Sequence, residues 1–353
     1  EYVRAIERDA RWLSSRFTRV VWTSNYFGVM YECALALIRK GLAYIDFNDA
    51  ETMRTMRGSF NEPGVESEHR NAPPEFHLEW FNKMRRGEVA ENAMVLRAKI
   101  DMAHPNMTMR DPVIYRVCHT PHHATGDTWK IYPMYDFAHP ISDAIEHITY
   151  SLCTLEFEDH RPLYDWVIHH CHDLLNHTPH QMEFARLDVE GVVLSKRKLH
   201  AVVERGEVNG WEDPRMPTVG GLRARGYTPA MLRLFVERCG VSKVNSVITN
   251  DVLEGCVADV LGPVAERRLA IAEPVVMHIR GLMSTLNVEM PNHPKDPARG
   301  HRGMTLPETI WVDKADVRLH PEANFWRIAP GNWVRLKHGL NVYIEAVLEK
   351  EDG

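Results

Sequence analysis

The feature that most constrains this 353-residue chain is a run of three cationic side chains, Lys196-Arg197-Lys198, which follows an aliphatic stretch and Ser195. Short basic runs mostly lie on solvated loops or helix faces, so we expect this one at the surface of the fold. Three adjacent cations can also surround a triphosphate, and a lysine among them can neutralise the charge that grows on departing pyrophosphate. The run is therefore a candidate phosphate-binding segment, with a solvated turn as the alternative.

Composition narrows the protein class. The length and the 44% hydrophobic content suffice for two or three domains with cores of their own. No run approaches the ~20 apolar residues that span a bilayer, and the first residues lack signal-peptide character, so we expect a globular cytoplasmic protein. The net charge of -6 argues against a general nucleic-acid coat, which leaves only local RNA contacts.

Metal and disulfide sites are disfavoured by spacing. The six cysteines show no C-x-x-C pair, which indicates reduced thiols. The histidines at 169, 170 and 172 lack the i, i+4 geometry of a helical zinc pair, because adjacent residues on a helix point in different directions.

Hydrophobic periodicity predicts alternating helices and strands. Helices are expected at 3–13, 27–38, 74–86, from 144, and at 163–175, 229–240 and 251–261, and strands at 42–46, 94–101, 114–118 and 129–135. Beyond residue 270, short β-rich runs such as 275–279, 309–312 and 333–337 suggest a barrel.

Several strings carry a specific family resemblance. The stretch at 192–199 (VVLSKRKL) resembles the K-M-S-K-S signature of class I aminoacyl-tRNA synthetases. In order and spacing, the chain closely resembles the glutaminyl-tRNA synthetases at 41–44 (GLAY), 96–102 (LRAKIDM), 110–113 (RDPV), 132–137 (YPMYDF), 141–146 (ISDAIE), 151–157 (SLCTLEF), 211–218 (WEDPRMPT) and 290–294 (MPNHP). The alternatives are the sister glutamyl-tRNA synthetases and a non-catalytic protein that keeps only the tRNA-binding surface.

The resemblance implies an α/β fold with a class I Rossmann core. It divides the chain into a remnant of the first Rossmann half (1–45), an inserted acceptor-end-binding domain (46–128), the second Rossmann half (129–190), the signature segment with a helical subdomain (191–270), and a partial anticodon-binding β-barrel (271–353). The family's H-I-G-H and R-F-D-D-T-N-P segments would precede residue 1, and much of its anticodon-binding region would follow residue 353. We therefore expect an internal fragment, inactive alone.

The implied activity is ATP-dependent ligation of glutamine to tRNA(Gln) through a glutaminyl-adenylate. The resemblance assigns the catalytic role to Lys196 and places Leu194, Ser195, Lys198 and Arg186 with it around ATP. Mg²⁺ would arrive with ATP and needs no protein-only metal site. The expected partners are tRNA(Gln), glutamine and ATP, without membrane or DNA, for a monomeric protein.

Two further sets of residues follow from the resemblance. Tyr135 and Gln181 match the residues that read the substrate amide, and Cys153 and Phe157 line the same region, although core packing explains the last two equally well. For tRNA, Phe60 takes the place of a leucine that, in the family, splits the first base pair. Asp159 takes the place of a carboxylate that accepts a hydrogen bond from a guanine amino group in the minor groove of the acceptor stem. Lys243 and Arg267 match positions near the anticodon stem and loop.

Overall fold

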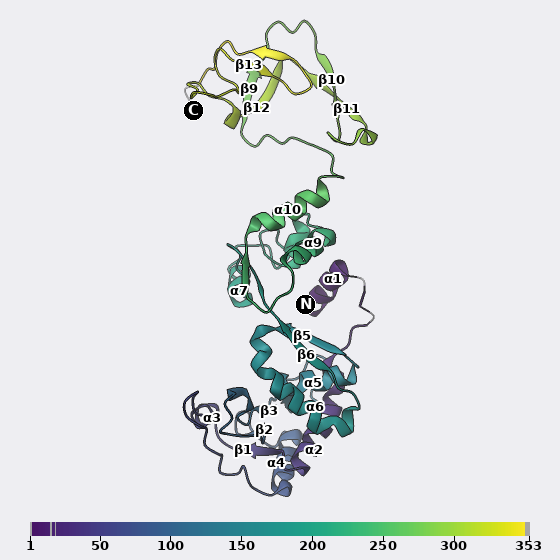
Figure 1. Cartoon of the computed structure of the whole chain (residues 1–353), viewed down its shortest axis with the longest axis vertical. Coiled ribbons are helices and arrows are strands. Elements are labelled where there is room, and N and C mark those ends of the chain that lie inside the picture. Colours follow the sequence, from purple (N-terminus) through teal and green to yellow (C-terminus); the bar gives the residue numbers. More distant parts are fainter. Residues whose placement is uncertain (1, 15, 18, 350–353) are drawn as a thin grey trace. The chain divides into compact units, whose positions relative to one another are not determined.

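The structure is a computed structural model that describes residues 2–14, 16, 17 and 19–349 (Figure 1). The chain divides into two compact units. Unit 1 consists of Glu1–Pro229 and Val236–Asn250, and unit 2 of Ala230–Phe235 and Asp251–Gly353. Unit 1 holds every predicted site residue except Arg267. In the described part of the chain, no helix is both long and apolar enough to cross a membrane.

Helices and strands are interspersed along both units. The α-helices are α1 (Tyr2–Leu13), α2 (Phe27–Arg39), α3 (Ala50–Met56), α4 (Pro74–Arg86), α5 (Tyr135–Ile145), α6 (Arg161–Leu175), α7 (Lys196–Glu204), α8 (Val219–Ala224), α9 (Pro229–Cys239) and α10 (Asn250–Leu261). The 3-10 helices are η1 (Thr23–Tyr26), η2 (Met107–Met109), η3 (Leu155–His160), η4 (Pro297–Arg299) and η5 (Lys314–Asp316).

The strands of unit 1 form three sheets. Four of them build an antiparallel sheet in the order β1-β2-β3-β4, and β5-β6 and β7-β8 form two parallel pairs. Their bounds are β1 (Ala43–Asp46), β2 (Val95–Ala98), β3 (Val113–Val117), β4 (Ile131–Pro133), β5 (Tyr150–Thr154), β6 (His180–Phe184), β7 (Leu187–Val189) and β8 (Ser246–Ile248).

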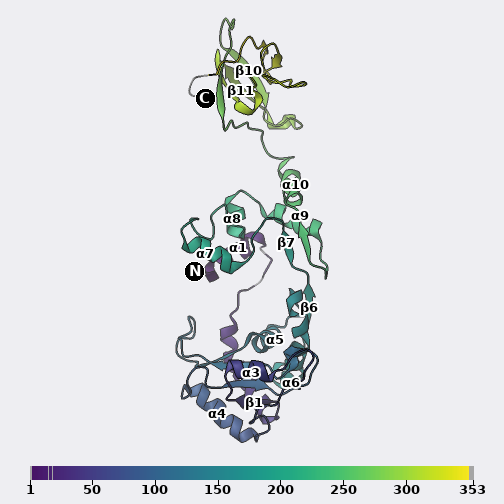
Figure 2. The ribbon, with the colours of Figure 1, turned by 90° about the vertical axis from the view of Figure 1, so that its left-hand side faces the viewer.

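The core of unit 1 lies around the four-stranded sheet. All four residues of β1 are buried, and the one charged member, Asp46, is paired with Arg97 of the neighbouring strand β2. Helices α2 and α4 pack against β1 and against each other (Figures 1 and 2). Met30, Leu37, Phe81 and Leu96 are fully buried there. The loop that carries Phe60 leads into α4, so this core holds one end of that loop.

A β-α-β crossover holds Cys153, Phe157 and Gln181 of the predicted amide site, and Tyr135 begins helix α5, which precedes it. Strands β5 and β6 pair in parallel, with Ser151 opposite Gln181 and Cys153 opposite Glu183, and α6 connects them. Helix α5 packs against α6. A parallel pair joined by a helix is the unit from which Rossmann sheets are built, so the α/β prediction is confirmed.

The local sequence predicted the ends of helix α4 correctly, but it predicted a helix from Ala144 that the structure does not contain. Helix α4 has the predicted bounds, because Pro74 fits the first turn and Gly87 ends the helix with a φ of 77°. The helix predicted to begin at Ala144 is wrong, since α5 ends at Ile145 and residues 150–154 form β5. His147 takes a left-handed φ of 55° just after α5, and parallel pairing with β6 then overrides helical propensity.

Unit 2 contains the strands predicted beyond residue 270. They are β9 (Pro274–His278), β10 (Leu286–Pro291), β11 (His301–Leu306), β12 (Thr309–Asp313), β13 (Trp333–Arg335) and β14 (Asn341–Tyr343). They pair as β9-β12, β10-β11 and β13-β14, all antiparallel. The described residues of unit 2 thus form three separate ribbons and no closed barrel, since hydrogen bonds do not join these pairs into one sheet.

Candidate functional site

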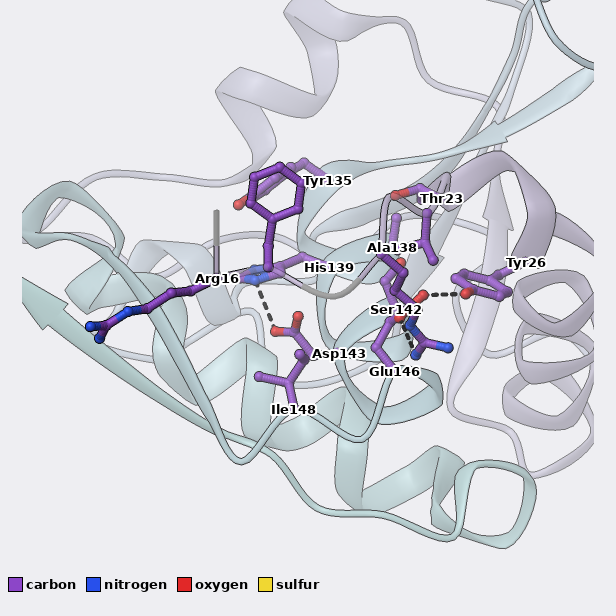
Figure 3. A pocket seen from close by; sticks show the side chains of 13 residues that line it. Arg16, Thr23, Tyr26, Tyr135, Ala138, His139, Ser142, Asp143, Glu146 and Ile148 are labelled. Atoms are coloured by element: carbon purple, nitrogen blue, oxygen red, sulfur yellow. Dashed lines mark hydrogen bonds and ion pairs between the residues drawn. The ribbon is translucent and has the colours of Figure 1, made fainter. Parts of the chain in front are cut away.

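A cavity of about 920 Å³ lies beside α5 in unit 1 (Figure 3). Its volume is typical of small-molecule sites. The lining comes from the segment before α2 and from α5 with the turn after it: Arg16, Phe17, Arg19, Val21, Thr23, Tyr26, Tyr135, Ala138, His139, Ser142, Asp143, Glu146 and Ile148. Within the described chain, the buried Ser142 Oγ has no hydrogen-bond partner.

Tyr135 is the predicted amide-reading residue that lines this cavity. It is the first residue of α5, and 56% of it is exposed. Its ring centroid lies 5.2 Å from that of His139 and 5.5 Å from that of Phe157. Partial burial raises the pKa of the Tyr135 phenol, so the hydroxyl stays protonated and can donate a hydrogen bond.

A polar network stands behind Tyr135. The His139 Nε2 atom lies 2.9 Å from both Asp143 Oδ2 and Ser151 Oγ, and the Tyr164 hydroxyl donates to Asp143 Oδ2 at 2.9 Å. Burial opposes ionisation of Asp143, but these hydrogen bonds outweigh it and lower the pKa of the carboxyl. The sequence prediction missed this network, although the i, i+4 spacing of His139 and Asp143 on one helix was a usable signal.

Glu146 closes another side of the cavity. It accepts hydrogen bonds from the Tyr26 hydroxyl and from Arg19 Nη2, the latter at 2.7 Å (Figure 3). The cationic charge of Arg19 is thereby compensated. No local pattern could predict this contact, because Arg19 precedes Glu146 by 127 residues.

The other amide-reading candidates lie on β5, η3 and β6. Gln181 is buried, and its Nε2 donates to Phe157 O at 3.1 Å and to Glu183 Oε1 at 3.0 Å. Cys153 Sγ lies 3.8 Å from Met182 O. Phe157 thus links Tyr135, through its ring, to Gln181, through its carbonyl. The structure brings these residues together, but of the four only Tyr135 is in the cavity lining.

The charges around Gln181 are paired. Glu183 is buried and forms two hydrogen bonds with Arg161, one of them at 2.8 Å. These bonds are the main reason that the pKa of Glu183 falls to about 2. Lys243, a predicted tRNA contact, lies 3.6 Å from Glu183 and 3.5 Å from Glu158.

The basic run begins a helix. Ser195 is the N-cap of α7, and Lys196, Arg197 and Lys198 form its exposed first turn, so the segment likened to a signature loop is helical from Lys196 onward. Cations are unfavourable at a helix N-terminus, whose backbone N–H groups attract anions. The run therefore opposes helix stability and favours an anionic ligand. Lys196 Nζ lies 4.5 Å from the centroid of the Tyr2 ring.

The remaining predicted residues have simpler surroundings. Leu194 is 45% exposed, and Arg186 is paired with Asp188 at 3.0 Å. In unit 2, the Arg267 guanidinium donates to two backbone carbonyls, those of Ala265 and Gly262. These residues stay predicted ligand contacts.

The two predicted acceptor-end contacts both belong to unit 1. Phe60 is 87% exposed. The exposed Asp159 has its carbonyl oxygen 2.6 Å from Asn106 Nδ2. Among the described residues no group of three or more His, Cys, Asp or Glu side chains is arranged to hold a metal ion, and this includes the histidines at 169, 170 and 172.

Comparison with known proteins supplies a family. Residues 1–262 match the family model described as "tRNA synthetases class I (E and Q), catalytic domain", and residues 265–353 match its "anti-codon binding domain". The structure is similar to that of a glutamate tRNA ligase from Elizabethkingia meningosepticum, with a TM-score of 0.47 and 16% identity, over 74% of this chain and 60% of that one.

Curated relatives match along the whole chain. A glutamine–tRNA ligase of Clostridium perfringens is 46% identical over 357 residues, which cover 100% of this chain and 64% of that protein. One of Actinobacillus succinogenes is 47% identical over 354 residues, covering 100% of this chain and 63% of its own length. The chain thus spans a little under two thirds of the length of these relatives.

Proposed function

The chain belongs to the family of class I tRNA synthetases (E and Q), and from this premise we propose that it ligates glutamine to tRNA(Gln) with ATP. The observation that carries the proposal is the linked set of Tyr135, Phe157 and Gln181 beside a cavity large enough for a small substrate. We also propose that the protein is located in the cytoplasm and is a monomer.

The proposed first step is adenylate formation. A carboxylate oxygen of glutamine forms a bond to the α-phosphorus of ATP, the bond to the β-phosphate oxygen breaks, and pyrophosphate leaves. Lys196, in the exposed first turn of α7, would offset the charge that grows on pyrophosphate, with Ser195, Lys198, Leu194 and Arg186 around the nucleotide. Mg²⁺ bound to the ATP phosphates would supply further charge compensation.

The proposed amide selectivity rests on charge compensation around the site. Arg161 is paired with Glu183 and Arg19 with Glu146, so the positive charge of these two arginines is already matched by carboxylates. A neutral amide suits such a site, and the protonated Tyr135 hydroxyl can donate to its oxygen. Cys153 and Phe157 would shape the apolar wall of this region.

The proposed second step is attack of the terminal adenosine hydroxyl of tRNA on the adenylate, which depends mainly on positioning. Phe60 and Asp159 are the proposed contacts at the acceptor end. Lys243 and Arg267 are the proposed contacts nearer the anticodon.

A glutamate substrate is the second candidate, and one observation favours it. Arg16 lines the cavity, and a cation there can pair with a substrate carboxylate. The sequence alternative of a non-catalytic tRNA-binding protein has no such observation in its favour.

One experiment separates these functions. The protein expressed from its complete reading frame is given ATP, tRNA(Gln) and either amino acid, and pyrophosphate exchange and charging are followed. We expect a kcat/KM ratio that strongly favours glutamine. A ratio that favours glutamate would establish the sister activity, and tRNA binding without exchange would establish a non-catalytic protein.

A further inference from the structure

The loop between α3 and α4 presents Phe60 in an unusual way. An aromatic ring normally gains by burial, yet Phe60 is 87% exposed at the tip of this loop. The loop is nonetheless closed by backbone hydrogen bonds: Ser59 N donates to Glu62 O at 3.1 Å, and Val65 N donates to Met56 O at 2.7 Å. An exposed ring on a fixed backbone is arranged for contact with a ligand.

Glycine makes this tight loop possible. Gly58 has a φ of 74°, and a Cβ there would lie 2.6 Å from Glu62 O. Gly64 also leaves no room for a side chain, since a Cβ would lie 2.9 Å from the carbonyl oxygens of both Met102 and Met56. The backbone on either side of Phe60 is therefore held in one conformation.

A buried arginine lies under the loop. Arg110 is 3% exposed, and its Nη1 atom lies 2.9 Å from each of three loop carbonyl oxygens, those of Arg57, Ser59 and Glu62. Its Nε donates to a fourth carbonyl, that of His104, at 2.7 Å. One guanidinium thus joins the Phe60 loop to the segment that begins at His104.

That second segment reaches Asp159. His104 Nδ1 accepts a hydrogen bond from Asn106 N at 3.0 Å, and Asn106 Nδ2 donates to Asp159 O at 2.6 Å. A continuous series of hydrogen bonds therefore runs from the Phe60 loop through Arg110 and Asn106 to Asp159. It connects the two residues that the family resemblance places at the acceptor end of tRNA.

The chemistry of Arg110 indicates a positioning role. Removing a guanidinium from water is costly, and neutral carbonyls compensate its charge less well than a carboxylate does. The planar fork of arginine can, however, hold several carbonyls in fixed relative positions, which a lysine cannot reproduce. A cation bonded in this way fixes the backbone geometry of a loop.

We propose that Arg110 is a positioning residue that fixes the Phe60 loop relative to Asp159, so that the ring can stack on the opened terminal base of an RNA acceptor end. This inference rests on the proposed function. Base-to-aromatic stacking contributes most when the ring is already in place as the end opens, because no free energy is then lost in ordering the loop.

The test uses Arg110→Met and Arg110→Lys, with Asn106→Ala as a variant that releases Asp159 without altering the buried cation. Arg116→Lys, an exposed arginine on β3, is the matched control. Each protein, expressed from its complete reading frame, charges tRNA(Gln) with an intact first base pair and a version in which that pair is mismatched. We expect the Arg110 variants and Asn106→Ala to lower kcat at least about tenfold on the intact tRNA and to stay within about twofold of wild type on the mismatched one.

Equal losses on both tRNAs, or no loss on either, would overturn the positioning role. If the Arg110 variants do not fold, Asn106→Ala decides the question by the same comparison. If the wild-type protein charges no tRNA, the proposed function fails, and the positioning role is decided by 2-aminopurine at the terminal base. We then expect its fluorescence to rise on binding wild type and not on binding the variants, and an equal rise would overturn the inference.

Discussion

Two groups of cations in unit 1 differ in how the fold uses them. In and beside the four-stranded sheet, Arg97 of β2 is 1% exposed and lies 2.6 Å from Asp46, and Arg70, in the loop before α4, lies 2.6 Å from the buried Asp111. The cations of the first turn of α7 are all exposed, at a helix end that disfavours them. In the sheet, therefore, the charges serve the fold, whereas in α7 they are available to a ligand.

The largest expected effect concerns the buried ion pair of Arg97 with Asp46. Arg97→Met should lower the free energy of unfolding by about 3–5 kcal/mol, because it leaves the carboxylate of Asp46 buried without a counter-charge. Urea denaturation measures it. The control Arg116→Met, at an exposed site on β3, should stay within about 0.5 kcal/mol of wild type. A loss for Arg97→Met as small as the control's would show that this pair does not hold the sheet together.

The substitution Lys196→Ala tests the exposed cations of the first turn of α7. We expect adenylate formation to slow roughly a hundredfold, corresponding to the loss of about 3 kcal/mol of transition-state stabilisation. The unfolding free energy and tRNA affinity should hardly change, since the side chain is exposed. Single-turnover kinetics decide it, with Arg116→Ala, at an exposed site on β3, as the control. An unchanged chemical step would remove Lys196 from the mechanism.

A smaller effect is expected on the preference for glutamine over glutamate, because the arginines around the amide site are already paired with carboxylates. Tyr135→Phe and Gln181→Glu should each reduce the preference for glutamine over glutamate by roughly tenfold, because each alters a hydrogen-bonding group that reads the amide. Competition between the two amino acids measures the ratio of kcat/KM values. Tyr150→Phe, an exposed tyrosine on β5, is the control. Parental ratios in both variants would place amide recognition elsewhere.

The smallest effect is a pH dependence. Arg161 lowers the pKa of Glu183 to about 2 from a usual value of 4.5, so the stabilisation by the ionised carboxylate is complete above pH 4.5 and is lost as the pH falls toward 2. The difference in urea midpoint between wild type and Glu183→Gln should therefore shrink across this window. The surface variant Glu79→Gln should differ little from wild type throughout. A constant difference for Glu183→Gln would contradict the assigned pKa.

Sequence reasoning was strongest where the signal was local. The bounds of α4 follow from Pro74 and Gly87, and the α/β class follows from alternating periodicity. It failed after Ala144, where pairing of β5 with β6 outweighed helical propensity. Short ambiguous segments depend on their partner strand, which periodicity does not identify.

The candidate site was predicted in part. Tyr135 lines the cavity, and Gln181 is linked to it through Phe157. Three other features went unpredicted: the His139 and Asp143 network, the Glu146 contacts, and the role of Arg110 under the Phe60 loop. The last two depend on contacts between residues far apart in the chain, which a single sequence without relatives does not reveal, whereas the i, i+4 spacing of His139 and Asp143 was a local sign of the first.

The sequence by itself determined the family, the alternation of helices and strands, and the exposure of the basic run, because motif spacing, periodicity and charge are local properties of the chain. Only the tertiary structure decided which charges are compensated. Arg97 and Arg110 look equivalent in the sequence, yet Arg97 is bonded to a buried carboxylate and Arg110 to the carbonyls of a loop. The physical reason is that the cost of burying a charge depends on which partners folding brings within hydrogen-bonding distance.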